Sequence, residues 1–477
     1  MFVALGRALQ LVLLLLMMRV AAGLLPPVEM GRMALINSST ALFALFLIGP
    51  VGQFINRRLF AWNETGAVQH YLKRYCGYVL CVCGLTTLLL CALDYAGFGT
   101  SHTPLAWLIF LITGSLFFNT LNQTLIPSLN LLGFGVWFVV LTLGTLLTGF
   151  VLAMIFVFSG RHEAEFWLTG LLAGQALFAL LGWCVFRKKI SPPRLGLQAM
   201  THAQIFSLFM FAWPIMAAAG MNWVQTQSYR FVLNGSLGLE SLGFFVAGYG
   251  LSAGLISGLE SMLMTWLHPV FYRNLSEGGN DSAERAWSEY AGAILPSILL
   301  FTCLIVALAP EVTRILLGPR YVASANYAIW GALAEAMRVV ASVYAMAAHA
   351  RMKTSLLLWP NALGAVLAVL LVFLLVPTLG GVGAGVALSV TGAILVLVWH
   401  RRIRREMAIA LPGRQLLVAL AMGASLVSVA AAMHYLPMLP TSLLDALLRA
   451  TLLVPLYLFM QYHLLPLTLR ARKSVSP

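Results

Sequence analysis

Residues 361–400 read NALGAVLAVLLVFLLVPTLGGVGAGVALSVTGAILVLVWH and contain no Asp, Glu, Lys or Arg. A membrane-spanning helix needs about 20 consecutive, mainly apolar residues, so the stretch is long enough for two spans. Pro377 and the glycines after it lie near its centre, where a chain that crosses the bilayer and returns needs a turn. The stretch therefore predicts a hairpin of two membrane helices.

The glycine cluster GGVGAGVA at residues 380–387 has the spacing of a dinucleotide-binding turn. Such a turn follows a β-strand in a βαβ unit, and an acidic residue comes about 20 positions later. Here an apolar run precedes the glycines, and around position 400 the chain has His400, Arg401 and Arg402, with no acid until Glu406. We therefore interpret the glycines as small residues that let two membrane helices approach closely.

The composition extends this interpretation to the whole chain. Its 477 residues are 61% hydrophobic and only 9% charged, with a mean hydropathy of +0.91, whereas soluble domains carry about 25% charged residues. So little charge cannot cover a surface that faces water. The prediction is an all-α polytopic membrane protein with about fourteen transmembrane helices. They are placed near residues 2–25, 33–56, 75–97, 104–124, 133–158, 165–186, 204–228, 240–266, 290–310, 325–348, 354–376, 380–400, 414–436 and 444–466.

The excess of basic residues falls in every second connection of this predicted map, hence on one side of the membrane, as the positive-inside rule requires. We therefore expect the N- and C-termini in the cytoplasm, and the formal net charge of +14 is mostly this topology signal. The basic residues are scattered between spans and not gathered on one domain, so we expect no nucleic-acid partner. The basic connections contain Arg57, Arg58, Lys73, Arg74, Arg187, Lys188, Lys189, Arg194, Arg273, Arg285, Arg351, Lys353, Arg401, Arg402, Arg404, Arg405, Arg414, Arg470, Arg472 and Lys473.

Two further sequence features do not indicate a catalytic, metal or ligand site. The cysteines lie in or beside apolar runs without metal-ligand spacing, so we expect neither a metal site nor a cofactor. Asp445 and Arg449 are four residues apart, and we expect them to form a self-satisfied surface pair. The six cysteines are Cys76, Cys81, Cys83, Cys91, Cys184 and Cys303.

Several motifs, in chain order, resemble those of the polysaccharide and oligosaccharide flippases. These flippases belong to the multidrug/oligosaccharidyl-lipid/polysaccharide exporter (MOP) superfamily. MMRVAAGLLPPVEMGRMAL, residues 17–35, is similar to that family's first connection, and APEVTRILLGPRYVASANYAIWGAL, residues 309–333, is similar to a loop and the tenth span. The P-x-x-G-x-x-G pattern that begins at Pro377 is similar to the following hairpin.

The resemblance implies two six-helix lobes followed by two additional helices. We expect an N-terminal lobe at residues 1–186, a basic cytoplasmic linker at 187–203, a C-terminal lobe at 204–400, and a basic loop, two helices and a tail at 401–477. It also implies a multi-pass protein of the bacterial inner membrane that flips an undecaprenyl-diphosphate oligosaccharide by alternating access through a V-shaped space between the lobes. Expected partners are this lipid-linked oligosaccharide, membrane lipid and polysaccharide polymerase or assembly proteins, with H⁺ or Na⁺ as the coupling ion.

Charges inside spans are the candidate coupling residues, because a charge at a helix centre costs about 2.5–3.5 kcal/mol on insertion scales. Glu335 and Arg338 lie mid-span and three residues apart, hence on one helix face. They either face a polar cavity or only neutralise each other. Glu260 has no basic residue near it in the sequence, so it either binds a proton or cation or is paired elsewhere. We assign Glu260 and Glu335 to coupling or ion binding.

The candidate substrate-binding residues are Arg19, Arg230 and Arg338 for the anionic diphosphate, with Gln227 and Trp223 beside them. Trp223, Gln227 and Arg230 follow at i, i+4 and i+7 and predict one polar stripe. For Arg230 the alternative is a side chain that extends to the lipid headgroups, and for Arg19 it is an interfacial anchor.

Other functions remain open at this point. A lipid II flippase and a cation-coupled drug exporter belong to the same superfamily. From another class, a membrane glycosyltransferase or polysaccharide polymerase is less compatible with the sequence, because the aspartates Asp94, Asp281 and Asp445 are isolated and the outer connections are short. No Gly-Lys dipeptide is present for the phosphate-binding loop of an ATP-driven pump. We therefore expect a transporter and not an enzyme.

Overall fold

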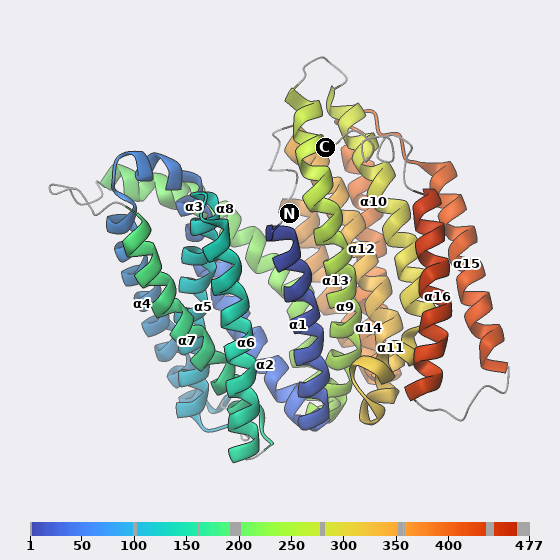
Figure 1. Ribbon diagram of the computed structural model, residues 1–477, viewed down its shortest axis with the longest axis horizontal. Helices are drawn as coiled ribbons and strands as arrows, with labels where there is room; N and C mark the ends of the chain where they lie inside the picture. The colour runs from blue at the N-terminus through green and yellow to red at the C-terminus, as the bar shows by residue number, and fades with distance from the viewer. Residues whose placement is uncertain are drawn as a thin grey trace. The chain divides into compact units, whose positions relative to one another are not determined.

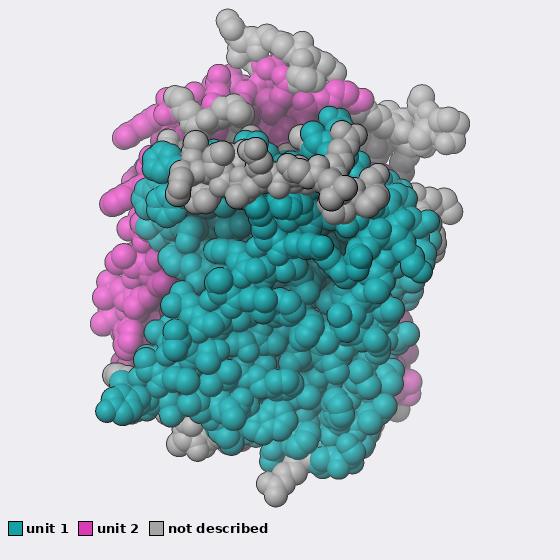
Figure 2. All heavy atoms as spheres, turned by 90° about the vertical axis from the view of Figure 1, so that its left-hand side faces the viewer, with its two compact units in different colours: residues 1–223 teal, residues 224–477 magenta. Residues whose placement is uncertain are grey.

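The computed structural model describes residues 2–98, 103–160, 162–190, 202–276, 282–351, 356, 358–435 and 443–464. Every regular element among them is helical. The chain divides into two compact units, residues 1–223 and 224–477, which Figure 2 shows in different colours. The all-helical membrane fold predicted from the sequence is confirmed.

Unit 1 is a bundle of long antiparallel helices (Figure 1). Its tightest contact joins α6 and α7, because Gly170 and Gly174, one helical turn apart, face the backbone of α6. A Cβ atom on Gly170 would lie 2.3 Å from the Cα of Ala153, so only a residue without a side chain permits this approach. The helices are α1 (Phe2–Leu24), α2 (Pro27–Phe43), α3 (Gly49–Glu64), α4 (Val68–Leu93), α5 (Leu105–Leu131), α6 (Gly135–Ser159), α7 (Ala164–Lys189) and most of α8 (His202–Gln227), with π-helical turns η1 (Ala44–Ile48) and η2 (Asp94–Phe98).

Unit 2 is organised around α10, whose most apolar stretch is 72% buried. This helix packs against α9, α12, α15 and α16. The fully buried Trp287 of α10 donates a hydrogen bond from Nε1 to the Val343 carbonyl oxygen of α12, 2.9 Å away. The elements are α9 (Tyr229–Ser276), α10 (Ser282–Ala307), α11 (Ala309–Leu316), the 3₁₀ turn η3 (Pro319–Ser324), α12 (Ala325–Ala350), α13 (Leu358–Leu379), α14 (Gly381–Ile403), α15 (Gly413–Tyr435) and α16 (Leu443–Leu464).

Twelve helical segments among the described residues are long and apolar enough to cross a membrane. One of them, Phe206–Leu275, is 70 residues long and contains two of the predicted spans, and the shorter apolar helix Leu9–Leu24 corresponds to the first. The expected arrangement of about fourteen spans therefore agrees with the structure. Large apolar side chains such as Leu88 and Leu417, each 69% exposed, cover the outer faces, as expected for surfaces in contact with lipid.

The predicted lobe boundaries are not resolved by the structure. Residues 191–201 of the expected linker 187–203 lie outside the described residues. The two compact units divide at Trp223, near the end of α8, which is the helix that follows the linker. The lobes at 1–186 and 204–400 therefore remain a prediction.

The glycine hairpin forms the turn between α13 and α14, and its glycines have a packing role. Gly380 has φ +60°, a left-handed conformation that favours glycine. A Cβ atom on Gly383 would lie 2.3 Å from the Leu375 carbonyl oxygen, and one on Gly385 would lie 2.5 Å from the Cβ of Trp330 on α12. The interpretation of this stretch as a site of close helix packing is confirmed.

Replacing Gly385 by alanine should destabilise the chain, because the new methyl group collides with the first side-chain carbon of Trp330, which cannot rotate away. Overpacking of this kind costs about 1–3 kcal/mol. Gly254→Ala on α9 is the matched control, since no described atom lies within 4 Å of its added Cβ. It should be neutral or stabilise the helix by up to about 1 kcal/mol. Thermal unfolding in detergent measures both, and equal midpoints would contradict the packing role.

Candidate functional site

Three charged residues of unit 2 form one group, the Glu260–Arg338–Glu335 cluster, which joins α9 to α12. Arg338 Nη2 donates a hydrogen bond to Glu260 Oε2 at 2.6 Å, and Arg338 Nε donates one to Glu335 Oε2 at 2.6 Å. Glu335 and Arg338 therefore lie on one helix face, as their spacing predicts, and they neutralise each other, which is one of the two alternatives that the sequence left open. Glu260 is paired with a base from another helix, which its own sequence neighbourhood does not reveal.

Neutral donors also bind both carboxylates. Tyr249 donates its hydroxyl to Glu335 Oε1 at 2.9 Å, and Ser342 donates its hydroxyl to Glu260 Oε1 at 3.1 Å. Ser342 thus extends the polar stripe of α12, as its spacing from Arg338 predicts. Buried charges are tolerated when they are paired and hydrogen-bonded in this way.

The cluster carries a formal charge of −1, because two carboxylates share one guanidinium. Glu260 and Glu335 are each only 7% exposed, whereas the Arg338 side chain is 36% exposed. Both carboxylates contact the same cation, so Arg338 is already neutralised before any substrate arrives. The arrangement attracts a cation or a proton more strongly than an anion.

A groove of about 470 Å³ runs beside the cluster along one face of α9. Glu260 and His268 line it two helical turns apart. The hydroxyl-bearing residues Ser257, Ser261 and Thr265, spaced four apart, line it as well, since residues with this spacing share a helix face. We name these five residues, together with Met264 and Pro269, the α9 groove.

His268 is held at its end of the groove by α10. Its Nε2 lies 3.2 Å from the hydroxyl oxygen of Tyr290, and the two rings stack with centroids 5.9 Å apart. Because Tyr290 is 2% exposed, it gives the imidazole a rigid support. The sequence prediction did not include His268, although its eight-residue spacing from Glu260 already places both on one face.

Arg230 and Gln227 lie on either side of the junction between α8 and α9, and both are partly buried. Arg230 Nε donates a hydrogen bond to the Tyr229 hydroxyl at 3.2 Å, and the guanidinium carbon lies 5.6 Å from the centre of that ring. Tyr229 in turn contacts Phe245 and Tyr249. Arg230 is therefore next to the aromatic group that supports the Glu335 carboxylate, and its assignment to substrate binding remains a prediction.

The other two predicted substrate residues belong to unit 1. Trp223 donates a hydrogen bond from Nε1 to the Ser38 carbonyl oxygen of α2, 2.9 Å away, which ties α8 to α2. Arg19 lies in α1 and is partly buried. The structure leaves the proposed anion-binding role of Arg19 untested.

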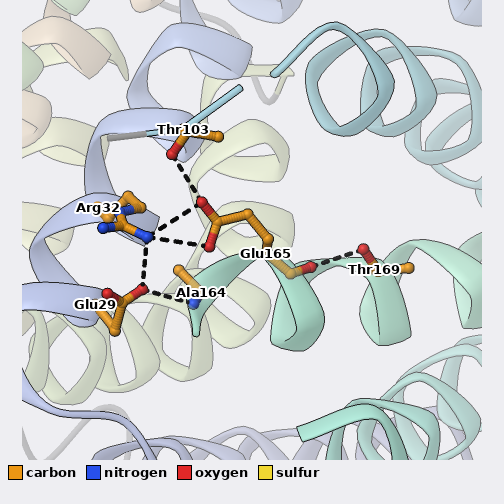
Figure 3. A network of polar contacts seen from close by, with 6 residues as sticks. All are labelled: Glu29, Arg32, Thr103, Ala164, Glu165 and Thr169. Atoms are coloured by element: carbon orange, nitrogen blue, oxygen red, sulfur yellow. Dashed lines mark hydrogen bonds and ion pairs between the residues drawn. The ribbon is translucent and has the colours of Figure 1, made fainter. Parts of the chain in front are cut away.

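Unit 1 contains its own buried network, which the sequence prediction missed (Figure 3). Arg32 Nη1 lies 3.3 Å from Glu29 Oε2 on the same helix and 3.3 Å from Glu165 Oε1 on α7. Glu165 also accepts a hydrogen bond from Thr103 at 2.7 Å, and Glu29 accepts one from the Ala164 backbone at 2.8 Å. The i,i+3 spacing of Glu29 and Arg32 was a usable signal, but nothing local connects them to Glu165.

Asp445 and Arg449 form the predicted pair, with Arg449 Nε 3.1 Å from Asp445 Oδ2, but the predicted surface location of the pair is wrong. Both residues are buried, at 5% and 8% exposure, and Arg449 also pairs with the buried Glu311 of α11 at 3.5 Å. Gln461 of α16 adds a 2.6 Å hydrogen bond to Ser297 of α10. The last helix is therefore joined to the unit by buried polar contacts, because its charged face packs inward instead of facing lipid.

Replacing Arg338 by glutamine should lower stability, because it leaves two largely buried carboxylates without a cation. Removing one partner of a fully buried pair costs about 3–5 kcal/mol. Because Arg338 is partly exposed, we expect a smaller loss in the free energy of unfolding, about 2 kcal/mol. Adding Glu260→Gln and Glu335→Gln to the same chain should recover most of the loss. Arg285→Gln, at an exposed position of α10, is the control, and thermal unfolding is the measurement. A loss no larger than that of the control would show that the cluster is not electrostatically coupled.

Comparison with known proteins places these clusters in a recognised fold. The chain is similar to lipid II flippase MurJ in an inward closed conformation, with TM-score 0.71 and 13% identity over 96% of this chain and 97% of that one. It is also similar to an inward-facing multidrug resistance MATE transporter of the MOP superfamily, with TM-score 0.58 and 16% identity over 82% and 91%. A variant of the Vibrio cholerae MATE transporter VcmN gives TM-score 0.54 and 13% identity over 84% and 94%.

These likenesses show that the fold is that of the MurJ and MATE transporters. Among curated proteins, none matches the chain significantly. Residues 20–326 match the model of the family described as "Polysaccharide biosynthesis protein". Because that match covers more than half of the chain, the protein is a member of this polysaccharide biosynthesis family, with a MOP-type transporter fold.

Proposed function

We propose that the protein is a flippase that moves an undecaprenyl-diphosphate oligosaccharide across the bacterial inner membrane during cell-surface polysaccharide synthesis. The family match over residues 20–326 is the observation that carries the proposal. The transporter fold and the buried charges within spans support it. No step requires bond chemistry, so the protein acts as a carrier and not as an enzyme.

The chemistry of such a substrate explains why a carrier is needed. The oligosaccharide and diphosphate cannot leave water for hydrocarbon unaided, because each unpaired polar group and charge carries a large desolvation cost. The polyprenyl tail can remain in lipid throughout. A carrier therefore only has to shelter the headgroup while access alternates between the two sides.

The residues divide between two tasks in this proposal. Arg19 and Arg230 are assigned to the diphosphate, because guanidinium groups match phosphate oxygens in geometry and charge. Gln227 and Trp223 are assigned to the substrate as well. Arg338 is held by its two carboxylates, so its contribution to anion binding requires that one of them be released.

Glu260 and Glu335 bind the coupling H⁺ or Na⁺. A proton or cation at the cluster would cancel its formal charge of −1 and weaken the connection between α9 and α12.

The membrane potential also contributes to the driving force in this proposal. With both termini in the cytoplasm, the substrate is loaded inside and moves outward with its negative charge. An inside-negative potential favours that movement by about 2.3 kcal/mol per charge per 100 mV. Polymerase or assembly proteins would receive the flipped substrate on the outer side.

A reconstituted flipping assay tests the proposal. The full-length protein is placed in vesicles with a fluorescent undecaprenyl-diphosphate oligosaccharide, and the fraction accessible to an added glycosidase is followed. Protein-dependent transfer supports the proposal. Parallel vesicles with lipid II and with a cationic drug test the two alternatives from the superfamily. Transfer of lipid II or the drug in place of the oligosaccharide would refute the assigned substrate.

Replacing Arg230 by glutamine should slow flipping at least tenfold, because the diphosphate loses a charged hydrogen-bond donor of the kind that contributes roughly 1.5–3 kcal/mol. Arg19→Gln should act in the same direction. Arg285→Gln removes an exposed arginine outside these groups and should leave the rate unchanged. Wild-type rates in both test variants would remove Arg19 and Arg230 from the substrate site.

A further inference from the structure

The α9 groove has hydrogen-bonding groups along its whole length. Ser257, Ser261 and Thr265 place a hydroxyl on every turn of the helix, and Glu260 and His268 lie along the same face. The Thr265 hydroxyl already donates to the Ser261 carbonyl oxygen at 2.7 Å, so it offers a ligand only an acceptor, and the Ser257 hydroxyl oxygen accepts from Arg338 at 3.4 Å and can still donate. A carboxylate has about four acceptor positions. Donors from Arg338 and Ser342 each use one position on Glu260, so acceptor capacity remains on the groove side.

The charge of the groove limits what it can hold. Among the described residues that line it, the only carboxylate is that of Glu260, which belongs to a cluster with formal charge −1. The cation of that cluster, Arg338, is bound to Glu260 and Glu335 at 2.6 Å in both contacts. An incoming phosphate or carboxylate group would therefore meet a net negative charge.

The size and lining of the α9 groove fit an organic ligand. The groove has a volume of about 470 Å³, within the roughly 300–1,000 Å³ range of small-molecule sites, and it is open on one side, because all seven of its lining residues belong to α9. Among the described residues, no group of three or more His, Cys, Asp or Glu side chains is placed to hold a metal ion. The apolar side chains of Met264 and Pro269 complete the groove, and they suit the C–H face of a sugar ring whose hydroxyls point to the serines.

We infer that the α9 groove is a charge-selective sugar subsite, which accepts neutral or amino-bearing sugar rings and rejects acidic sugars and the diphosphate. This inference rests on the proposed function for the origin of the sugar, because it assigns the groove to the headgroup of the transported lipid. Glu260 accepts sugar hydroxyls or an ammonium group, and the hydroxyl row and His268 bind the remaining ring substituents. Glu260 thereby sets which oligosaccharides the protein carries.

Three methyl glycosides that differ in one substituent provide a direct test. Methyl glucoside is neutral, methyl glucosaminide carries an ammonium group at neutral pH, and methyl glucuronide carries a carboxylate. Saturation-transfer NMR on the full-length protein in nanodiscs measures the dissociation constant of each. We expect the glucosaminide to bind most tightly and the glucuronide to bind roughly fivefold more weakly than the glucoside, the effect of one unit charge about 4 Å away in a water-like medium.

Two variants separate charge from hydrogen bonding. Glu260→Gln should bring the dissociation constants of the three glycosides together, and Glu240→Gln, at an exposed position on the same helix, should not. The double variant Ser261→Ala, Thr265→Ala leaves every charge in place, so it should weaken all three glycosides and preserve their order. This second variant keeps the test available if Glu260→Gln does not fold.

Several results would overturn the inference. These are binding of none of the glycosides, glucuronide binding equal to that of the glucosaminide, and an unchanged order in a folded Glu260→Gln protein. A site that responds only to added sodium ions and not to any glycoside would also overturn it. Because these measurements use soluble glycosides, they are independent of the flipping assay. Glycoside binding can be absent while lipid-linked oligosaccharide is still flipped, and it can be present while no flipping is observed.

Discussion

The sharing of Arg338 by Glu260 and Glu335 is the charged interaction on which the contact between α9 and α12 depends. Arg338 contacts Glu260 and Glu335 at 2.6 Å each, and no other arrangement in that unit links α9 and α12 through charge among the described residues. The second carboxylate leaves the cluster with a formal charge of −1. It gives the adjoining groove a negative character and directs the search for the diphosphate site toward other arginines.

Close packing by small residues and local charge compensation together make such a fold possible. Glycines at α6–α7 and at the α13–α14 hairpin let backbones touch where hydrophobic transfer gives no net drive. Polar networks then appear where helices meet, at Glu29–Arg32–Glu165 and at Glu311–Arg449–Asp445. Each pairs charges from helices distant in sequence, so each fixes a helix contact that apolar surfaces alone would leave free to slide.

Much of this was predictable from the sequence, because membrane spans follow from uninterrupted apolar runs and short-range pairs follow from helical spacing. The Glu335–Arg338 pair and the packing role of the glycine hairpin are of this kind. Three ion pairs could not be predicted, because their partners are 78 to 138 residues apart and leave no periodic signal in one sequence. These are Glu260 with Arg338, Arg32 with Glu165 and Arg449 with Glu311. The burial of Asp445 and Arg449 was missed for the same reason, since a charged pair at i,i+4 has the same sequence whether it faces inward or outward.

The most direct test of this account is a cryo-electron microscopy structure of the full-length protein bound to an undecaprenyl-diphosphate oligosaccharide whose sugars are uncharged. We predict sugar density along α9 from Ser257 to His268, an intact Arg338 bridge, and phosphorus positions outside hydrogen-bond reach of Arg338. A diphosphate bound to Arg338, with Glu260 or Glu335 displaced, would contradict the view that this cluster is a negative element that excludes phosphate.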